Sequence, residues 1–274
     1  MHILDQIVQH KKKEVSRRKA VTPMSSLIKE WTYQPISMKE NILSGSGVIS
    51  EFKRRSPSKP TINLNALVDQ VTPYYEAAGA SAISVLTDSN FFGGSDEDLN
   101  AARLLNRIPL LRKDFIVDEY QIYESRNLGA DCILLIARIL SKEEILAFTK
   151  VAQGIGLEVL VEIHNHKELR KLSIMPDLVG VNNRNLDTFE VDYQNSINLI
   201  SQLPQSVCKI AESGIQSVEI MWQLYNAGFD GFLIGEKFMA TDNPGTACKQ
   251  MISEYLIGRN KLQLISKERN NKKT

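Results

Sequence analysis

The chain is poor in the features that mark several classes of protein. It has three cysteines among 274 residues, and Cys132, Cys208 and Cys248 stand far apart without a CxxC pair. Such usage predicts a reducing, cytoplasmic compartment and argues against a disulfide scaffold. No segment approaches the roughly 18 consecutive apolar residues that span a bilayer. The N-terminal MHILDQIVQHKKK has no continuous apolar stretch, so we expect no signal peptide.

An excess of charge of one sign is also absent. The 33 Lys and Arg residues balance 32 Asp and Glu residues, for a net charge of +1, so no overall field attracts nucleic acid or a membrane. Basic residues cluster only locally, at 11–13, 17–19 and 267–273, which is typical of a solvated helix face or a chain end. We therefore expect neither nucleic acid nor a membrane as a partner. A small-molecule partner and a monomeric chain are expected as well.

What the chain does contain is a regular alternation of short apolar runs with helical patterns. The runs lie near 48–52, 82–86, 109–112, 131–136, 158–162, 177–181, 207–212 and 230–234. Ala-Gly or Leu-Gly pairs that end helices recur between them. Eight strand–helix units of roughly 25 residues predict an α/β fold, a (β/α)8 or TIM barrel. The alternative, a doubly wound open sheet, usually has a glycine-rich turn after its first strand, where this chain has KRRSPSKP.

The residues before the first apolar run predict a helical extension. Apolar residues recur at helical spacing at Ile3, Leu4, Ile7 and Val8. A second short helix is predicted after Thr-Pro at 22–23, and Pro35 ends it. No Gly/Ser-rich linker follows. The predicted division is an extension packed on the barrel at 1–45, the barrel at 46–260 and a frayed basic tail at 261–274.

Polar residues stand at the carboxyl ends of five apolar runs. They are Glu51 with Lys53, Arg112 with Lys113, Glu162, Asn182, and Glu212 with Ser213. A charge buried without a partner costs several kcal/mol, whereas the carboxyl ends of barrel strands hold the active site. The recurrence therefore predicts one polar active site at the mouth of the barrel, and with it an enzyme.

These residue types suit particular chemistry, beside plainer structural explanations. Strand alternation puts Glu51 and Lys53 on one face, where they hold each other ionised or form a structural salt bridge. Lys113 suits a Schiff-base nucleophile, a general acid or the counter-ion of an anion, and is otherwise a solvated lysine. Glu162 suits a general acid or base in an apolar-walled mouth.

Glycines after the seventh and eighth runs predict a phosphate site. Loops at these two strands of a barrel often bind phosphate through backbone N–H groups and a helix N-terminus. Gly214 and Gly235 allow the close approach that such binding needs. Closure of the barrel brings Ser56 and Lys53 beside the eighth strand. Glu236 fits this site if only its backbone N–H faces the phosphate.

Further polar groups follow the fifth and sixth runs. Asn182 can orient a hydroxyl and Arg184 can pair with an anion, although an Asn-rich turn with a surface arginine has the same pattern. His164 and His166 in IHNHKE would suit a metal only with a carboxylate–histidine spacing that is weak here. A polar helix cap is the favoured interpretation of the histidines, and no metal is expected.

Eight segments carry a family resemblance, in order from residue 3 to about residue 240: ILDQIVQHKKKEV, ISEFKRRSPSKP, AGASAISVLTDSNFFGGS, PLLRKDFIVDEYQIYESRNLGAD, LEVLVEIHN, GVNNRNL, IAESGI and GFLIGEKFM. The chain resembles the indole-3-glycerol phosphate synthase family of tryptophan biosynthesis. The resemblance implies a TIM barrel whose helical extension helps cover the substrate. It also implies a carboxy-lyase that closes the ring of 1-(2-carboxyphenylamino)-1-deoxyribulose 5-phosphate with loss of carbon dioxide and water, using no cofactor or metal.

The resemblance also implies roles for single residues. Lys113 would be the general acid on the ketone oxygen, Lys53 the partner of the substrate carboxylate and a participant in dehydration, and Glu162 the base or proton shuttle for dehydration. The polar network around them would comprise Glu51, Asn182, Glu212 and Ser213. Substrate binding would involve Ser56, Gly214, Gly235 and Glu236 at the phosphate and Phe92 and Phe115 at the aromatic ring. Arg184 and Leu233 would also contact the substrate. The interval from Glu162 to Asn182 is one residue shorter than the family leads us to expect, and the difference falls within 165–177.

Two alternatives stay open at this point. A phosphoribosylanthranilate isomerase, a related barrel acting one step earlier, would need a Cys/Asp acid–base pair. Cys132 lies inside a predicted strand, and the first strand offers Glu and Lys instead. A non-catalytic phosphosugar-binding barrel would keep Gly214 and Gly235 without needing Lys113 or Glu162.

Overall fold

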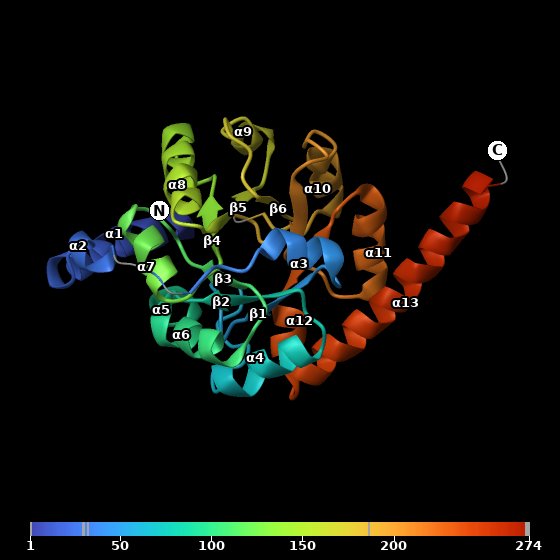
Figure 1. Cartoon of the computed structure of the whole chain (residues 1–274), viewed down its shortest axis with the longest axis horizontal. Coiled ribbons are helices and arrows are strands. Elements are labelled where there is room, and N and C mark those ends of the chain that lie inside the picture. The colour runs from blue at the N-terminus through green and yellow to red at the C-terminus, as the bar shows by residue number, and fades with distance from the viewer. Residues whose placement is uncertain (1, 29–30, 32, 186, 272–274) are drawn as a thin grey trace.

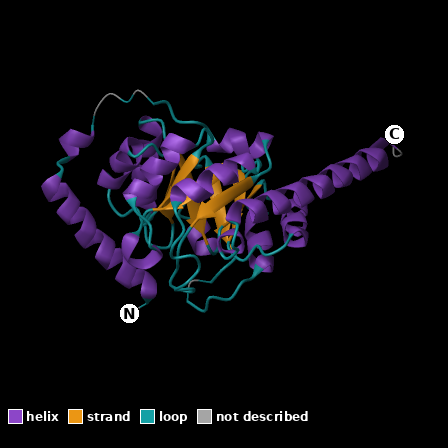
Figure 2. Cartoon of the chain, turned by 90° about the horizontal axis from the view of Figure 1, so that it is seen from below, coloured by secondary structure: helices purple, strands orange, loops and turns teal. Residues whose placement is uncertain are grey.

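A closed barrel of parallel strands forms the centre of the molecule. The computed structural model describes all residues except 1, 29–30, 32, 186 and 272–274, and no side chain from residue 260 onward. Within this part of the chain, eight strands pair in the order β1 to β8, and β1 pairs with both β2 and β8. Helices surround the strands (Figure 2). The predicted (β/α)8 barrel is confirmed.

The strands and helices alternate along the chain as the pattern predicted. The strands are β1 Val48–Phe52, β2 Ala82–Leu86, β3 Leu110–Lys113, β4 Cys132–Ile136, β5 Glu158–Ile163, β6 Leu178–Asn182, β7 Cys208–Glu212 and β8 Gly231–Ile234. The helices are α1 Ile3–Val21, α2 Met24–Leu27, α3 Met38–Ser44, α4 Val68–Ala77, α5 Ser89–Phe92, α6 Asp96–Leu105, α7 Tyr120–Asn127, α8 Lys142–Gly154, α9 His166–Leu169, α10 Tyr193–Ile200, α11 Val218–Ala227, α12 Glu236–Met239 and α13 Pro244–Asn271.

Helices begin and end where the sequence supplies caps. Ser141 and Glu144 form a capping box at the start of α8, in which each side chain accepts from the other residue's backbone N–H. The glycines predicted to end helices, Gly79, Gly129 and Gly228, have φ angles of 89°, 84° and 107°. These left-handed values are unfavourable for residues that carry a Cβ, so glycine ends the helix there.

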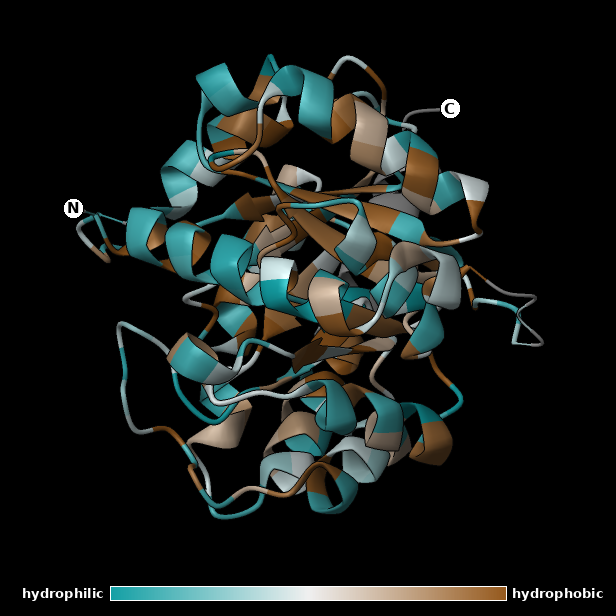
Figure 3. Cartoon of the chain, turned by 90° about the vertical axis from the view of Figure 1, so that its left-hand side faces the viewer, coloured by the Kyte–Doolittle hydropathy of each residue, from teal (hydrophilic) through white to brown (hydrophobic). Residues whose placement is uncertain are grey.

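Strand alternation divides the apolar core into two layers. Outward side chains such as Val85 and Val161 pack beneath the helices in one large cluster. Inward side chains such as Leu111 and Leu160 form a second cluster inside the barrel. Hydrophobic colour accordingly gathers on the strands, whereas the outer helices carry much hydrophilic colour (Figure 3). The barrel interior is therefore a packed core, and polar groups can gather only at its ends.

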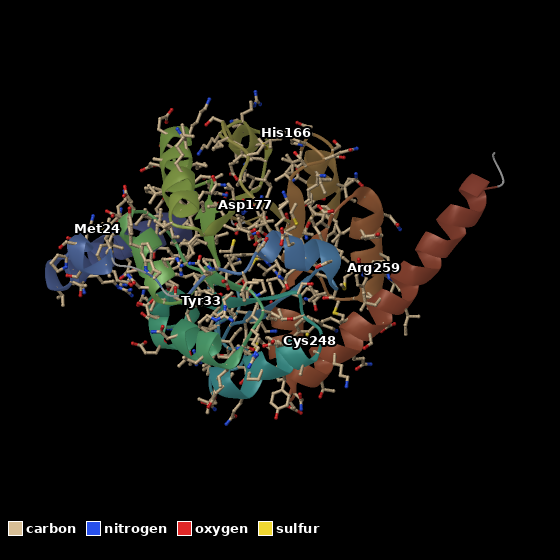
Figure 4. The ribbon with its side chains drawn as sticks, in the orientation of Figure 1. Met24, Tyr33, His166, Asp177, Cys248 and Arg259 are labelled. Atoms are coloured by element: carbon tan, nitrogen blue, oxygen red, sulfur yellow. The ribbon has the colours of Figure 1, made fainter. Side chains whose placement is uncertain are left out.

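The amino ends of the strands are closed by α3 and by polar contacts. Met38 N of α3 donates to Glu158 at the start of β5, over 2.7 Å, and α3 lies in front of the strands in Figure 1. Asp177, just before β6, accepts from Val159 N at 2.9 Å. Tyr33 and Asp177 are labelled on this side in Figure 4. Contacts at the amino ends of barrel strands stabilise the fold, whereas active sites lie at the carboxyl ends.

Helix α1 covers the carboxyl ends of the strands. Its buried face consists of Leu4, Ile7, Lys11 and Val15, at the spacing of one helical stripe. Leu4 and Ile7 join the inner core cluster. The Lys11 ammonium is buried and lies 2.9 Å from Asp114 Oδ1, directly after β3. The extension is thus packed on the barrel at the end where the predicted site lies.

Helix α13 continues across the boundary that the sequence placed at residue 260. It runs without a break from Pro244 to Asn271, and its last turns extend beyond the body of the molecule (Figure 2). The division into extension, barrel and tail stays a prediction. In the part of the chain that the structure describes, none of the helices combines the length and the apolar character needed to cross a membrane.

Candidate active site

A cavity opens at the carboxyl ends of the strands, beneath α1. It is lined by Ile3, Leu4 and Ile7 of α1, by strand-end residues and by the loops that follow the strands. Of the residues that the sequence suggested, the lining includes Glu51, Lys53, Ser56, Phe92, Lys113, Phe115, Glu162, Asn182, Arg184, Ser213, Gly214, Leu233, Gly235 and Glu236. The remaining one, Glu212, lies behind Lys113. Strand residues of β1, β2, β3, β4, β5, β6 and β8 therefore meet in one cavity.

Lys113 occupies the centre of the polar floor. Its Nζ lies 3.2 Å from Glu212, 3.7 Å from Glu51 and 4.0 Å from Glu162. Burial alone would lower the pKa of Lys113, but these three carboxylates outweigh burial and raise it above its ordinary value. Lys113 is consequently a charged ammonium before substrate arrives. Such a group suits a proton donor or an anion partner better than an uncharged nucleophile.

Glu51 and Lys53 form the pair that strand alternation suggested. Lys53 Nζ lies 2.5 Å from Glu51 Oε1. Burial would raise the pKa of Glu51, but the charges of Lys53 and Lys113 outweigh it and lower the pKa. Gly235 permits this packing, because a Cβ atom at that position would overlap Glu51 Oε1. Glu51 thus joins the first strand to the eighth across the closure of the barrel.

Glu162 and Glu212 are both buried, yet their pKa values move in opposite directions. Burial favours the neutral form of each. For Glu162, the His164 imidazole 3.2 Å away, the charge of Lys113 and the Asn182 amide outweigh burial and lower the pKa to about 2. For Glu212, burial outweighs the attraction of Lys113, and the neighbouring charge of Glu162 adds to it, so the pKa rises to about 7. One carboxylate and one acid group poised near neutrality therefore face the same lysine.

One wall of the cavity is apolar and aromatic. The rings of Phe92 and Phe115 lie 5.7 Å apart at an interplanar angle of 41°. Leu134 and Ile136 of β4 and the apolar face of α1 complete this wall. A flat aromatic group fits beside such tilted rings.

The opposite wall is built from glycine loops and short turns. Ser213 and Gly214 after β7 have φ angles of 67° and 74°. The Glu236 carboxylate is turned toward Lys59, with Glu236 Oε1 3.0 Å from Lys59 Nζ. Ser56 lies in a turn closed by mutual backbone hydrogen bonds with Lys59, both of 3.0 Å. This wall exposes backbone and hydroxyl groups to the cavity, as an anion site requires.

Some polar residues lie elsewhere than a reading of the strand ends suggests. Arg112 does not line the cavity: it is buried outside the barrel, with Nη2 3.1 Å from Asp96 Oδ1 and Nη1 3.1 Å from Ser125 Oγ. Alternation predicts this, since Arg112 and Lys113 are neighbours on one strand.

The Arg184 guanidinium donates to Phe189 O at 2.9 Å. The segment at 165–177 holds only one short helix, α9 at His166–Leu169.

Sequence reasoning missed one residue beside the site. His164 is not the side-chain cap of α9, since Asn165 caps that helix. Instead, His164 Nε2 lies 3.2 Å from Glu162 Oε1. The position of His164 two residues after a strand-end carboxylate was the available signal, because alternate residues of an extended segment share a face.

Comparison with known proteins gives matches over nearly the whole chain. The family model described as indole-3-glycerol phosphate synthase matches residues 4–251. An indole-3-glycerol phosphate synthase of Bacteroides thetaiotaomicron is 46% identical over 253 residues, covering 91% of this chain and 97% of the relative. One from Azoarcus sp. is 41% identical over 259 residues, covering 91% and 98%.

Solved structures show a likeness of fold. A thiamine phosphate pyrophosphorylase from Pyrococcus furiosus matches with a TM-score of 0.58 at 15% identity, covering 80% of this chain and all of that one. A chain of the tryptophan synthase complex from Pyrococcus furiosus matches with a TM-score of 0.55 at 14% identity, covering 77% and 98%. At such identities the likeness supports the barrel and no particular activity.

Proposed function

Because the chain belongs to the indole-3-glycerol phosphate synthase family, we propose that it closes the indole ring of 1-(2-carboxyphenylamino)-1-deoxyribulose 5-phosphate. The products are indole-3-glycerol phosphate, carbon dioxide and water, in tryptophan biosynthesis. The observation that carries this proposal is the position of Lys113. Its ammonium stands among three carboxylates, between an aromatic wall and a wall of glycine loops.

The substrate carries an anion at each end, and the cavity offers a matching site for each. The phosphate would bind the wall formed by Ser56, Gly214, Leu233, Gly235 and Glu236. The substrate carboxylate would pair with Lys53, and its aromatic ring would lie against Phe92 and Phe115. Holding both ends bends the chain between them so that the reacting carbons meet, and such positioning contributes up to several kcal/mol.

Ring closure would begin at the ketone of the sugar chain. The aromatic carbon that bears the carboxylate attacks the ketone carbon, and a carbon–carbon bond forms. The ketone oxygen takes a proton from Lys113 and becomes a hydroxyl. The bond to the carboxylate then breaks, carbon dioxide leaves, and its electron pair restores the aromatic ring. One positioned general acid contributes about 10²–10⁴-fold to such a step.

Dehydration would complete the indole. The new hydroxyl leaves as water after gaining a proton, for which Lys53 is the proposed donor. The adjacent carbon loses a proton to Glu162, and the double bond of the indole forms between the two carbons. Glu162 is suited to this role because its pKa of about 2 keeps it ionised.

The other polar residues would hold these groups in place. Asn182 donates to Glu162 Oε1 at 3.1 Å, and Glu212 lies 3.2 Å from Lys113. Glu51 would fix Lys53, while Ser213 and Arg184 would contact the sugar chain or the phosphate at the mouth. These assignments follow the family pattern and agree with the contacts among these side chains.

One assay tests the proposed reaction. The purified chain is incubated with the anilino-deoxyribulose phosphate in the presence of a chelator, and indole fluorescence is followed. We expect indole-3-glycerol phosphate to form at the same rate with the chelator as without it. Absence of product from a folded protein would refute the synthase assignment, and a signal lost only with chelator would refute the metal-free chemistry. Phosphoribosylanthranilate offered alone distinguishes the isomerase, because only that enzyme would consume it.

We further propose that the chain acts as a monomer in the cytoplasm. Its three cysteines are all free and buried, as in a reducing compartment. The cavity is complete within a single chain. Size-exclusion chromatography with light scattering at micromolar concentration tests the monomer, and a mass of twice 30.9 kDa would contradict it.

A further inference from the structure

His164 lies directly behind Glu162, away from the substrate. It follows β5, is buried, and does not contribute to the lining of the cavity. Its imidazole bridges two carboxylates: Nε2 lies 3.2 Å from Glu162 Oε1 and Nδ1 lies 3.1 Å from Glu168 Oε2. An imidazole between two carboxylates donates from both nitrogens when it is protonated.

The second carboxylate is itself rigidly held. Glu168 Oε2 accepts from His164 N at 2.7 Å, and Glu168 Oε1 accepts from Asn165 Nδ2 at 2.9 Å. Asn165 Oδ1 in turn caps α9 by accepting from Lys167 N and Glu168 N. Asn195 Nδ2 of α10 donates to His164 O at 3.0 Å. The imidazole is thus fixed from its own backbone, from α9 and from α10.

The two oxygens of Glu162 have different partners. Oε1 accepts a hydrogen bond from Asn182 Nδ2 at 3.1 Å and forms an ion pair with His164 Nε2, which lies 3.2 Å away. Oε2 is turned toward Lys113, whose Nζ lies 4.0 Å away. Only Oε2 is therefore directed to the place where a reacting proton would arrive.

We propose that His164 is a positioning residue: as an imidazolium backed by Glu168, it anchors Oε1 of Glu162, keeps that carboxylate ionised and directs Oε2 to the substrate. This inference rests on the function proposed above. It assigns His164 no contact with substrate and no proton transfer of its own. It explains why a buried histidine stands in line with two carboxylates when Asn165 already caps the helix.

The charges around the pair support this arrangement. Glu162 faces Lys113 on β3, Glu51 on β1 and Glu212 on β7, and the last two carboxylates disfavour its ionised form. Burial lowers the pKa of His164, but Glu162 and Glu168 outweigh it and raise the pKa to about 9. Asp187, in the loop before α10, lies within the field of His164 as well. Two positive groups lie close to Glu162: His164 Nε2 at 3.2 Å from Oε1 and Lys113 Nζ at 4.0 Å from Oε2.

The test compares His164→Gln with a matched control. Glutamine keeps a hydrogen-bond donor and removes the charge. His166→Gln makes the same change two residues later, at an exposed site whose Nδ1 contacts Gln202. For each variant, kcat and KM are measured from pH 3 to pH 9.5 on the anilino-deoxyribulose phosphate.

We expect kcat of His164→Gln to fall about tenfold or more while KM stays within about twofold. Toward pH 3 the kcat of His164→Gln should decline while that of His166→Gln is nearly unchanged, because Glu162, whose pKa of about 2 depends on His164, gains a proton more readily in the first variant. An acidic limb and kcat equal to those of the control would overturn the proposal. A histidine that only stabilised the fold would lower the melting temperature and leave the limb in place.

A second variant covers failure of the first to fold. Glu168→Gln keeps the acceptor for His164 N but removes the charge that holds the imidazolium. We expect the basic limb of its pH profile for kcat to lie at lower pH than that of wild type. The acidic limb should be unchanged. An unmoved basic limb contradicts the proposal. If wild type and His166→Gln form no product, the proposed function has failed, a result distinct from either outcome for His164.

Discussion

Two buried ionic clusters lie side by side in this protein, and they treat their carboxyl groups in opposite ways. One joins α1 to the segment after β3 and contains Asp114, whose pKa falls to about 2. The other is the floor of the cavity and contains Glu212, whose pKa rises to about 7. The two side chains are almost equally inaccessible, at 2% and 1% exposed. Burial alone therefore does not determine whether a carboxyl group is ionised.

The number of donors for each carboxylate explains the difference. Asp114 accepts from Thr87 Oγ1 at 2.6 Å and from Phe115 N at 2.7 Å, and Lys11 and Arg112 lie 2.9 and 3.4 Å away. Glu212 has Lys113 at 3.2 Å, and that lysine also serves Glu51 and Glu162. Asp114 thus has two hydrogen-bond donors in addition to its cations and stays ionised, whereas Glu212 has only a lysine shared with two other carboxylates and gains a proton more readily.

The largest effect should come from removing the shared lysine. We expect Lys113→Ala to lower kcat by about 10²–10⁴-fold or more, because the proposed general acid for the ketone oxygen is lost. A phosphorylated product analogue should still bind, since the glycine loops are untouched. Fluorescence turnover and analogue titration measure the two quantities. Turnover near that of wild type would refute the general-acid role.

Removing the central cation of the structural cluster should affect stability first. Lys11 lies 3.0 Å from Asp88 Oδ2 and 2.9 Å from Asp114 Oδ1, so Lys11→Met leaves two buried carboxylates short of a partner. We expect a loss of about 3–5 kcal/mol in the free energy of unfolding. Lys12→Met, one residue along the same helix and exposed, should change it by less than about 0.5 kcal/mol. Equal urea midpoints for the two variants would contradict the structural role of the cluster.

The two carboxyl groups should respond to pH with opposite signs. The lowered pKa of Asp114 stabilises the folded state above pH 4, and this stabilisation is lost as pH falls toward 2. Asp114→Asn should therefore cost about 2 kcal/mol at pH 7 and progressively less in acid. Urea unfolding of wild type and variant at pH 3, 5 and 7 measures the change. A cost that does not depend on pH would show that Asp114 acts by packing alone.

Glu212 should show the reverse dependence. Its folded pKa of about 7 lies above the ordinary 4.5, so folding takes up a proton between these values and stability falls as pH rises through them. Glu212→Gln cannot ionise, and we expect it to gain about 1–3 kcal/mol relative to wild type between pH 5 and pH 8. If the difference in unfolding free energy between Glu212→Gln and wild type were the same at pH 5 and at pH 8, Glu212 would be ionised over this range, as Asp114 is.

The exposed ion pair between Lys19 of α1 and Asp118 should contribute least to the free energy of unfolding. Lys19 Nζ lies 2.8 Å from Asp118 Oδ2, and both side chains are more than a third exposed. We expect Lys19→Met to change the free energy of unfolding by less than about 1 kcal/mol, and less again in high salt. A cost as large as that of Lys11→Met would mean that contact with α1, and not burial, sets the value of these pairs.

Local patterns account for the parts of the molecule that sequence reasoning found. The apolar runs, the helix-ending glycines and the alternation of Glu51 and Lys53 each depend on neighbours within a few residues. The polar strand ends marked the cavity because every strand of a closed parallel barrel presents its carboxyl end to the same side. Arg112 shows the limit of that reasoning, since it shares a strand end with Lys113 and points out of the barrel.

The sequence by itself determined the barrel, the family and the residues that line the mouth, because periodicity and motif order are written along the chain. Only the tertiary structure decided which carboxylate gains a proton, which cation ties α1 to β3, and what His164 is for. Those properties are sums of Coulomb and burial energies over side chains from different strands. The partners of Lys113 stand at 51, 162 and 212, and no local pattern shows that they meet.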